Sequence, residues 1–186
     1  MRKLVLFLFL ISCAPPPVTL FERYATVKTA NSTGSAISVG HGVFITATHV
    51  ITSDSFIVFN QRGVDKEPLR FLQFGDITIF KSDLDTNVAM VAIAEPKLGE
   101  KVYVLQPVFT DAGVERLLFQ GNVAYISKLY AMIDRPIFQG ISGSGVYNMN
   151  GELIGMASQL YGIQGQVAFG IFLKVSPLKP ILEKVK

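Results

Sequence analysis

Two residues with complementary chemistry, a serine and a histidine, stand in segments suited to expose them. Ser142 lies in the Gly-Ile-Ser-Gly-Ser-Gly segment of residues 140–145. Glycines around a serine let the backbone turn tightly, expose the hydroxyl and aim backbone N–H groups beside it. His49 ends a strand-like run, residues 42–50. Because serine is a weak nucleophile and histidine has a pKa suited to accepting its proton, this pair indicates nucleophilic catalysis.

Both segments also have a purely structural interpretation. A Gly/Ser segment is equally typical of a plain turn, and a lone histidine is usually structural or exposed. We expect the structural role for His41, the second of the chain's two histidines, because nothing around it suggests a partner. Two histidines, one cysteine and scattered carboxylates form no recognisable metal-ligand spacing. No metal and no cofactor are expected.

The elements that would position this pair are mainly strands. Short stretches rich in Val, Ile, Phe and Thr alternate with Gly, Asn and Asp, which is typical of a sandwich or barrel. The expected strands cover residues 24–28, 36–46, 55–60, 77–81, 89–94, 101–105, 121–127, 143–147, 153–158 and 167–175.

The C-terminal segment has a different, helical pattern. Ser176 can cap a helix and Pro177 suits its first turn. One face of this helix would be apolar, formed by Leu178, Ile181, Leu182 and Val185. We therefore expect an amphipathic helix to close the chain.

Two of these segments resemble the motifs of trypsin-like serine proteases. Thr-Ala-Thr-His-Val at residues 46–50 resembles their Thr-Ala-Ala-His block, and residues 140–145 resemble their Gly-Asp-Ser-Gly-Gly-Pro block. Further segments resemble, in order, those of the bacterial HtrA-type branch and the strands that flank the specificity pocket: residues 98–104, 121–123, 134–137, 151–158 and 170–175. The likeness covers roughly residues 36–185, and no peptide-binding PDZ domain is expected.

The resemblance implies a fold and a mechanism. The fold is all-β, with two antiparallel six-stranded β-barrels of the chymotrypsin type and a C-terminal α-helix, in a protease domain at residues 21–186. Ser142 would attack the scissile carbonyl of a polypeptide substrate and His49 would accept its proton. The backbone N–H groups of Gly140 and Ser142 would form the oxyanion hole.

The third member of the triad departs from the family pattern. The carboxylate that orients the histidine usually precedes a Leu-Ala-Val-Leu type strand, but Asn87 stands before Val-Ala-Met-Val at residues 88–91. Asp85 can take the role through a shifted loop, and Asn87 can hold the ring by a hydrogen bond without stabilising an imidazolium. Asp83 is interpreted as a solvated turn residue. Asp85 and Asn87 both stay open.

The same resemblance predicts the substrate pocket and excludes one mode of regulation. A zymogen switch needs an Asp just before the nucleophile, and this chain has Ile141 there. The pocket candidates carry no charge, so we expect an apolar residue at the cleavage position. They are Pro136, Ile137, Ser158, Gln159, Leu160 and Gly170.

The N-terminus is interpreted as an export signal. Residues 1–12 place Arg-Lys before an apolar run too short to span a bilayer, as in a signal peptide. The following Cys13, the only cysteine, resembles a lipobox cysteine, although an ordinary buried thiol is the alternative. Residues 13–20 would then form a lipidated, proline-rich tether to a membrane, in the periplasm or cell envelope.

Two other functional classes compete with an active protease. A catalytically impaired homologue would bind peptides in the old cleft, and a structural β-barrel lipoprotein would need neither His49 nor Ser142. Nucleic-acid binding is not expected, because the net charge of +3 comes without a run of basic residues. A monomer or small oligomer is expected.

Overall fold

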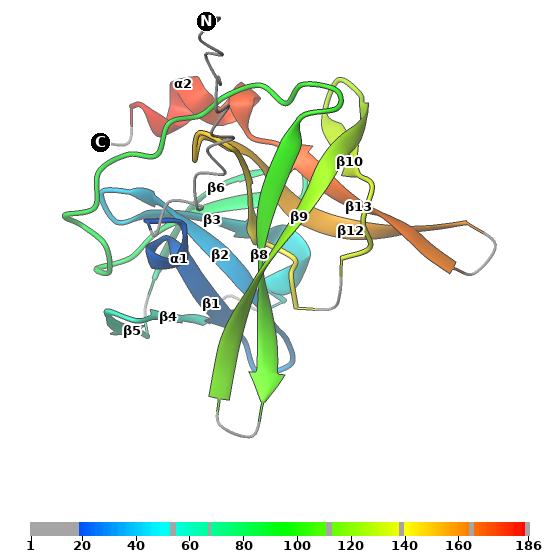
Figure 1. Ribbon diagram of the computed structural model, residues 1–186. Coiled ribbons are helices and arrows are strands. Elements are labelled where there is room, and N and C mark those ends of the chain that lie inside the picture. The colour runs from blue at the N-terminus through cyan, green and yellow to red at the C-terminus, as the bar shows by residue number, and fades with distance from the viewer. Residues whose placement is uncertain are drawn as a thin grey trace, which may run out of the picture.

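Strands dominate the chain in the computed structural model, which describes residues 19–52, 55–66, 68–110, 113–137, 140–163 and 166–184. Figure 1 shows the strands gathered in two sheets, with short helical segments near both ends. Residues 1–18, with the expected signal peptide, Cys13 and most of the tether, lie outside the described part. Within that part, no helix has the length and apolarity needed to cross a membrane.

The first sheet has seven antiparallel strands. Their spatial order is β5 (Gly63–Asp65), β4 (Ile57–Asn60), β1 (Tyr24–Lys28), β2 (Thr33–Gly40), β3 (Val43–Ala47), β7 (Ile77–Lys81) and β6 (Leu69–Phe74). This differs from the closed six-stranded barrel that was expected. The end strands of this order are β5 and β6, and among the described residues β5 pairs only with β4 and β6 only with β7, so the sheet does not close.

The second sheet is a closed six-stranded antiparallel barrel, as expected. Its strands follow the order β10 (Tyr130–Ile133), β13 (Gln166–Lys174), β12 (Leu153–Ile163), β11 (Gly145–Asn148), β8 (Lys101–Thr110) and β9 (Gly113–Ile126). Figure 1 shows the β8–β9 and β12–β13 hairpins projecting well beyond the barrel. The predicted all-β class is confirmed.

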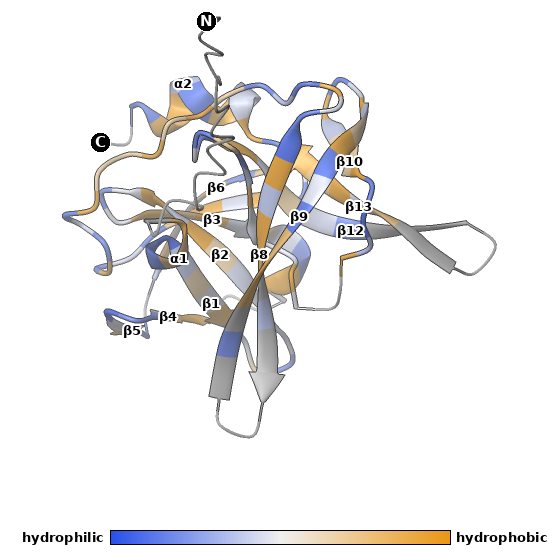
Figure 2. Cartoon of the chain, viewed as in Figure 1, coloured by the Kyte–Doolittle hydropathy of each residue, from blue (hydrophilic) through white to orange (hydrophobic). Residues whose placement is uncertain are grey.

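Apolar side chains hold the two sheets together. The larger core cluster joins β1, β2 and β3 of the first sheet to barrel residues such as Tyr103 and Tyr147. A second cluster fills the barrel itself and includes Ile137 and Ile141. Strand β3 is buried along its whole length, and the Phe44 ring stacks on Phe80 of β7 with centroids 5.4 Å apart. Figure 2 shows hydrophobic residues along these central strands.

The segment that connects the two sheets is extended, but most of it is not the strand expected at residues 89–94. Val91 donates its N–H to Val39 of the first sheet, and Leu153 of the barrel donates to the Ala92 carbonyl. Ile93 forms an isolated parallel bridge with Leu153. Because this segment bonds to both sheets in turn, it cannot pair continuously with either.

Short helical segments complete the described chain. Helix α1 (Thr19–Glu22) precedes β1, and the 3₁₀ helix η1 (Thr48–Val50) follows β3. At the C-terminus the 3₁₀ helix η2 (Ser176–Leu178) continues into α2 (Lys179–Leu182). Leu178 and Leu182 are buried, as the predicted apolar face requires, whereas Val185 lies outside the described residues. Ser176 does not cap the helix with its side chain, because the helix already includes it.

Candidate active site

The histidine of the site follows a strand that is buried along its whole length. Strand β3 ends at Ala47 and the chain turns into η1, which carries His49. Val50 is buried beneath this turn, and the backbone N–H of Thr48 donates to the Asp76 carbonyl at 2.9 Å. The His49 side chain is consequently fixed at its base and still 47% exposed.

The carboxylate that holds His49 is Asp76, which we did not identify in the sequence. The Nδ1 atom of His49 lies 2.9 and 3.0 Å from the two carboxylate oxygens of Asp76. The backbone N–H of His49 also donates to Asp76 Oδ1, at 3.1 Å. Ser158 donates its hydroxyl to Oδ2 at 2.6 Å. Such a carboxylate selects the ring tautomer with a proton on Nδ1 and leaves Nε2 free to accept one.

The two orienting groups expected from the sequence lie elsewhere. Asp85 is buried in the loop after β7 and accepts hydrogen bonds from Asn60 Nδ2 at 3.1 Å and Arg62 Nη1 at 3.0 Å. Asn87 is exposed, and no hydrogen bond joins it to His49 in the described structure. The prediction that Asp85 or Asn87 contacts His49 is therefore wrong. The physical reason is that Asp85 turns toward the β4–β5 hairpin, away from the end of β3.

Strand register explains why Asp76 meets His49. Strands β3 and β7 are antiparallel neighbours, with Ala47 opposite Ile77. The residues just after β3 and just before β7 must then lie side by side. Residues 77–81 were expected to form a strand, so a carboxylate directly preceding it was the available signal.

The nucleophile candidate Ser142 stands in a loop that needs glycines. Gly140 and Gly143 have φ values of 88° and 94°, where glycine is favoured. A Cβ at Gly143 would lie 1.8 Å from the carbonyl oxygen of Ser35 in the first sheet, so no side chain fits there. The hydroxyl of Ser142 donates to the Ser158 carbonyl at 3.1 Å. No hydrogen bond joins Ser142 to His49 in the described part of the chain.

Ser158 thus connects the two halves of the site. Its hydroxyl bonds to Asp76 of the first sheet and its carbonyl accepts the hydroxyl of Ser142 in the barrel. The side chain was expected to line the substrate pocket, but it is buried and directed at Asp76. His49, Asp76, Ser158 and Ser142 form one cluster drawn from both sheets.

The expected oxyanion-hole donors are near the nucleophile and available. The backbone N–H groups of Gly140 and Ser142 have no hydrogen-bond acceptor among the described residues. The carbonyl of Gly140 is directed at the first sheet, where it accepts a hydrogen bond from the Ser35 hydroxyl at 2.8 Å. Residues 138–139, which precede Gly140, lie outside the description.

The other pocket candidates gather on the barrel. Gly170 is buried against the side chain of Ile137, since a Cβ there would lie 2.7 Å from Ile137 Cγ2. Leu160 pairs with Gly170 across β12 and β13, and Gln159 and Pro136 are exposed. These pocket candidates include the apolar side chain of Ile137 and no charged residue.

His41 and Asp83 have the structural positions expected of them. His41 is exposed in the turn between β2 and β3, at a φ of 54°, and its backbone N–H donates to the Val88 carbonyl. Asp83 is exposed in the loop after β7, where its backbone N–H donates to Asp65. Neither side chain belongs to the site.

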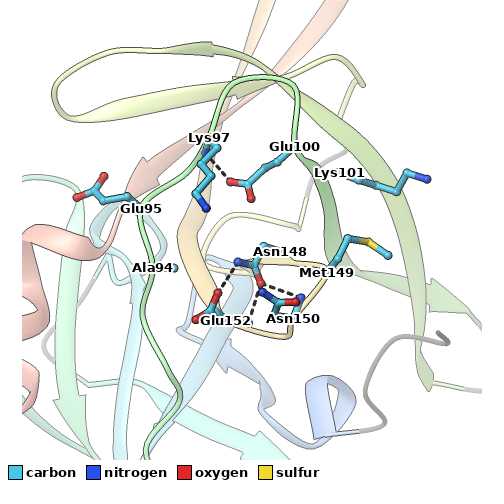
Figure 3. Close-up of a pocket in the computed structure, with 9 residues that line it drawn as sticks. All are labelled: Ala94, Glu95, Lys97, Glu100, Lys101, Asn148, Met149, Asn150 and Glu152. Atoms are coloured by element: carbon cyan, nitrogen blue, oxygen red, sulfur yellow. Dashed lines mark hydrogen bonds between the residues drawn. The ribbon is translucent and has the colours of Figure 1, made fainter. Parts of the chain in front are cut away.

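Two cavities among the described residues lie away from this cluster. One, of about 320 Å³, is shown in Figure 3. In it the side chain of Asn148 donates to Glu152, and the backbone of Lys97 donates to Glu100. Its lining residues are Ala94, Glu95, Lys97, Glu100, Lys101, Asn148, Met149, Asn150 and Glu152. Since none of them belongs to the His49 cluster, we do not assign chemistry to it.

Comparisons with known proteins identify the family and the fold. Residues 33–156 match the family model of the trypsin-like peptidase domain. No curated protein matches the chain. Among solved structures, a serine endoprotease from Yersinia pestis shares 22% identity at a TM-score of 0.73, covering 92% of this chain and 67% of its own.

Two further structures are similar. The inactive form of Rv3671c from M. tuberculosis H37Rv, solved as a serine-to-alanine mutant, shares 16% identity at a TM-score of 0.70, covering 90% of this chain and 88% of its own. A Glu endopeptidase in complex with MPD shares 14% identity at a TM-score of 0.73, covering 89% of this chain and 91% of its own. At such identities these structures establish the fold alone, which is chymotrypsin-like.

Proposed function

Because the chain belongs to the trypsin-like peptidase family, we propose that it is a serine endopeptidase with Ser142 as nucleophile and His49 as general base. The observation that carries this proposal is the bonding of His49 Nδ1 to Asp76 at 2.9 Å. It supplies the orienting carboxylate that the sequence motifs had left undecided. The substrate class is a polypeptide.

The reaction follows from the positions of these groups. Ser142 Oγ attacks the scissile carbonyl while Nε2 of His49 takes its proton, and Asp76 stabilises the resulting imidazolium. The oxyanion is held by the N–H groups of Gly140 and Ser142. His49 then protonates the leaving amine, and a water activated by the same ring hydrolyses the acyl-enzyme. At rest the Ser142 hydroxyl donates to the Ser158 carbonyl, so this hydrogen bond must break before the proton can pass to His49.

The impaired-homologue alternative loses its main support. It depended on Asn87 standing where the family has a carboxylate, because an amide cannot stabilise an imidazolium. Asp76 bonds to both His49 Nδ1 and the His49 backbone N–H. The proposed site therefore has a candidate for the nucleophile, for the general base and for the carboxylate that orients the base. We therefore retain the active enzyme as the proposal.

Labelling with a fluorophosphonate tests the proposal directly. The wild-type protein should be labelled, and Ser142→Ala should not, because the probe reacts only with an activated serine. Ser144→Ala is the matched control. Ser144 lies in the same motif but is buried, and its hydroxyl has no partner in the described structure. Absence of label on the wild type would instead support a peptide-binding module.

Substrate preference gives a second test. The Ile137–Gly170 contact and the lack of charge at the pocket positions favour an apolar side chain before the scissile bond. Peptides that differ only in Leu or Arg at this position should separate by at least about tenfold in kcat/KM. Equal turnover of the two would contradict the assignment of this pocket.

For localisation, we propose that Cys13 is lipidated and tethers the protease to a membrane at the cell envelope. The support is the apolar run followed by a lipobox-like cysteine in the sequence. Cells expressing the full chain with a labelled fatty acid should incorporate label into the wild type and not into Cys13→Ala. Equal incorporation by the two proteins would rule out Cys13 as the acceptor.

A further inference from the structure

A buried serine of the first sheet forms two hydrogen bonds to the loop that carries Ser142. Ser35 of β2 donates its backbone N–H to the Ser142 carbonyl at 2.9 Å. Its hydroxyl donates to the Gly140 carbonyl at 2.8 Å. We propose that Ser35 is a positioning residue for the oxyanion hole, a role that rests on the proposed protease function. Its hydroxyl would hold the peptide after Gly140 so that the N–H groups of Gly140 and Ser142 keep their aim.

The direction of the hydrogen bonds around Ser35 is fixed by chemistry. A carbonyl only accepts, so the single hydroxyl proton of Ser35 is committed to Gly140. The Tyr24 hydroxyl, 3.2 Å from Ser35 Oγ, must then donate to it. Thr26 lies behind, with its hydroxyl 3.5 Å from that of Tyr24. The hydroxyls of Tyr24 and Ser35 therefore point their protons in succession toward the loop, and hydrogen bonds in such a chain polarise one another.

Ser35 is itself held firmly. It is fully buried, and it pairs with Thr26 across β1 and β2. The hydroxyl of Thr46 on β3 donates to the Ser35 carbonyl at 2.7 Å. The same carbonyl faces Gly143 so closely that no Cβ would fit there. The loop thus meets a rigid part of the first sheet at Gly140, Ser142 and Gly143.

This contact matters because an oxyanion hole acts through preorganised donors. Donors that must move at the moment of reaction lose much of their effect. Gly140 has a φ of 88° and lacks a side chain to limit its backbone, so outside contacts must limit it. On the other side of the loop, Ile141 is buried in the barrel core. The hydroxyl of Ser35 supplies the corresponding restraint from the first sheet.

Ser35→Ala removes this restraint and leaves the backbone bond to Ser142. We expect kcat to fall about tenfold, below the 10²–10³ lost when an oxyanion donor itself is removed, with KM within about twofold. A peptide boronate, which places an oxygen where the oxyanion forms, should bind about tenfold more weakly. A role confined to stability would lower the Tm without moving kcat or boronate affinity below the unfolding transition.

Ser38→Ala is the matched control. Ser38 lies on the same strand, is equally buried and loses the same atom, but its hydroxyl has no partner within the described structure. This variant should keep the wild-type kcat. If Ser35→Ala fails to fold, Tyr24→Phe takes its place, because it removes the donor to Ser35 and keeps the ring. It should lower kcat two- to threefold at constant KM.

The outcomes separate this proposal from the protease assignment. A wild type that neither reacts with a fluorophosphonate nor cleaves peptides would overturn both. An active wild type whose Ser35→Ala variant keeps kcat and boronate affinity within twofold would overturn the role of Ser35 alone. Equal losses in Ser35→Ala and Ser38→Ala would also overturn it, since they would reflect a general effect of core hydroxyls.

Discussion

Replacing Asp76 by asparagine tests the orienting role of this residue with the least change in shape. The carboxylate accepts hydrogen bonds from the ring and the backbone of His49 and from Ser158. An asparagine offers one acceptor oxygen and one NH₂ donor in their place. If the NH₂ faces Nδ1, the ring must carry its proton on Nε2, and Nε2 can no longer accept the proton of Ser142.

The expected size of the effect follows from this tautomer change. In serine proteases the same replacement lowers turnover about 10⁴-fold, equivalent to about 5 kcal/mol of transition-state stabilisation. The bond between Asp76 and Ser158, at 2.6 Å, adds to the loss because Ser158 also contacts the nucleophile. KM should change little, because Asp76 does not lie among the expected substrate-pocket residues.

The assay compares two Asp→Asn variants. Steady-state kcat with one peptide, and the rate of fluorophosphonate labelling, are measured for Asp76→Asn and Asp85→Asn below their unfolding temperatures. Asp85 is the alternative carboxylate, but it bonds to Asn60 and Arg62 rather than to His49. Asp85→Asn should lower the Tm and retain kcat. A large loss of kcat in Asp85→Asn with activity retained in Asp76→Asn would refute the assignment.

Three further perturbations test other parts of the structure. Gly143→Ala should lower kcat about 10²-fold, because its Cβ would collide with a carbonyl and displace the nucleophile, whereas Gly99→Ala, at a φ of 78° with nothing within 4 Å, should not. In chemical denaturation, Leu182→Ala should lower the free energy of unfolding by about 2–5 kcal/mol, against at most about 0.5 for Leu98→Ala on the surface. Burial raises the pKa of Asp134, but hydrogen bonds from β9 and the adjacent arginine outweigh it, so the pKa lies below its ordinary value. The ionised Asp134 should therefore contribute fully to stability above about pH 5, and this contribution should vanish as pH falls through the lowered pKa. The free energies of unfolding of wild type and Asp134→Asn should converge over that pH range. A constant difference down to about pH 2 would contradict this.

The sequence singled out His49 and Ser142 as candidates, but it did not single out the carboxylate that bonds to His49. The segments around His49 and Ser142 are local motifs: their glycines and strand residues shape the backbone only within a few residues of the side chain that they present. The position of Asp76 depends on which strand pairs with β3, and this is a long-range property. The family pattern places the carboxylate before residues 88–91, but in the structure these residues form an extended segment that bonds to both sheets and is not paired as a strand.

Strand lengths were underestimated for a similar reason. Strand β8 was expected to end at Leu105, near a proline that normally interrupts a sheet. In the structure Pro107 lies within β8, opposite Arg116 of β9. A proline is tolerated where one edge of a strand is unpaired, and β11 pairs with β8 only at residues 102–104. The sequence cannot show that the β8–β9 hairpin continues beyond the barrel, because the pattern of pairing decides it.

The site depends on contacts between sheets that fold from distant parts of the chain. Ser35 meets Gly140 and Ser142, and Ser158 meets Asp76, across sequence separations of 82 residues or more. The motif around Ser142 therefore does not build a working site by itself, because hydrogen bonds from the first sheet hold its backbone in place. A substitution in β2 that never touches the substrate should consequently alter the rate of the chemical step more than substrate binding.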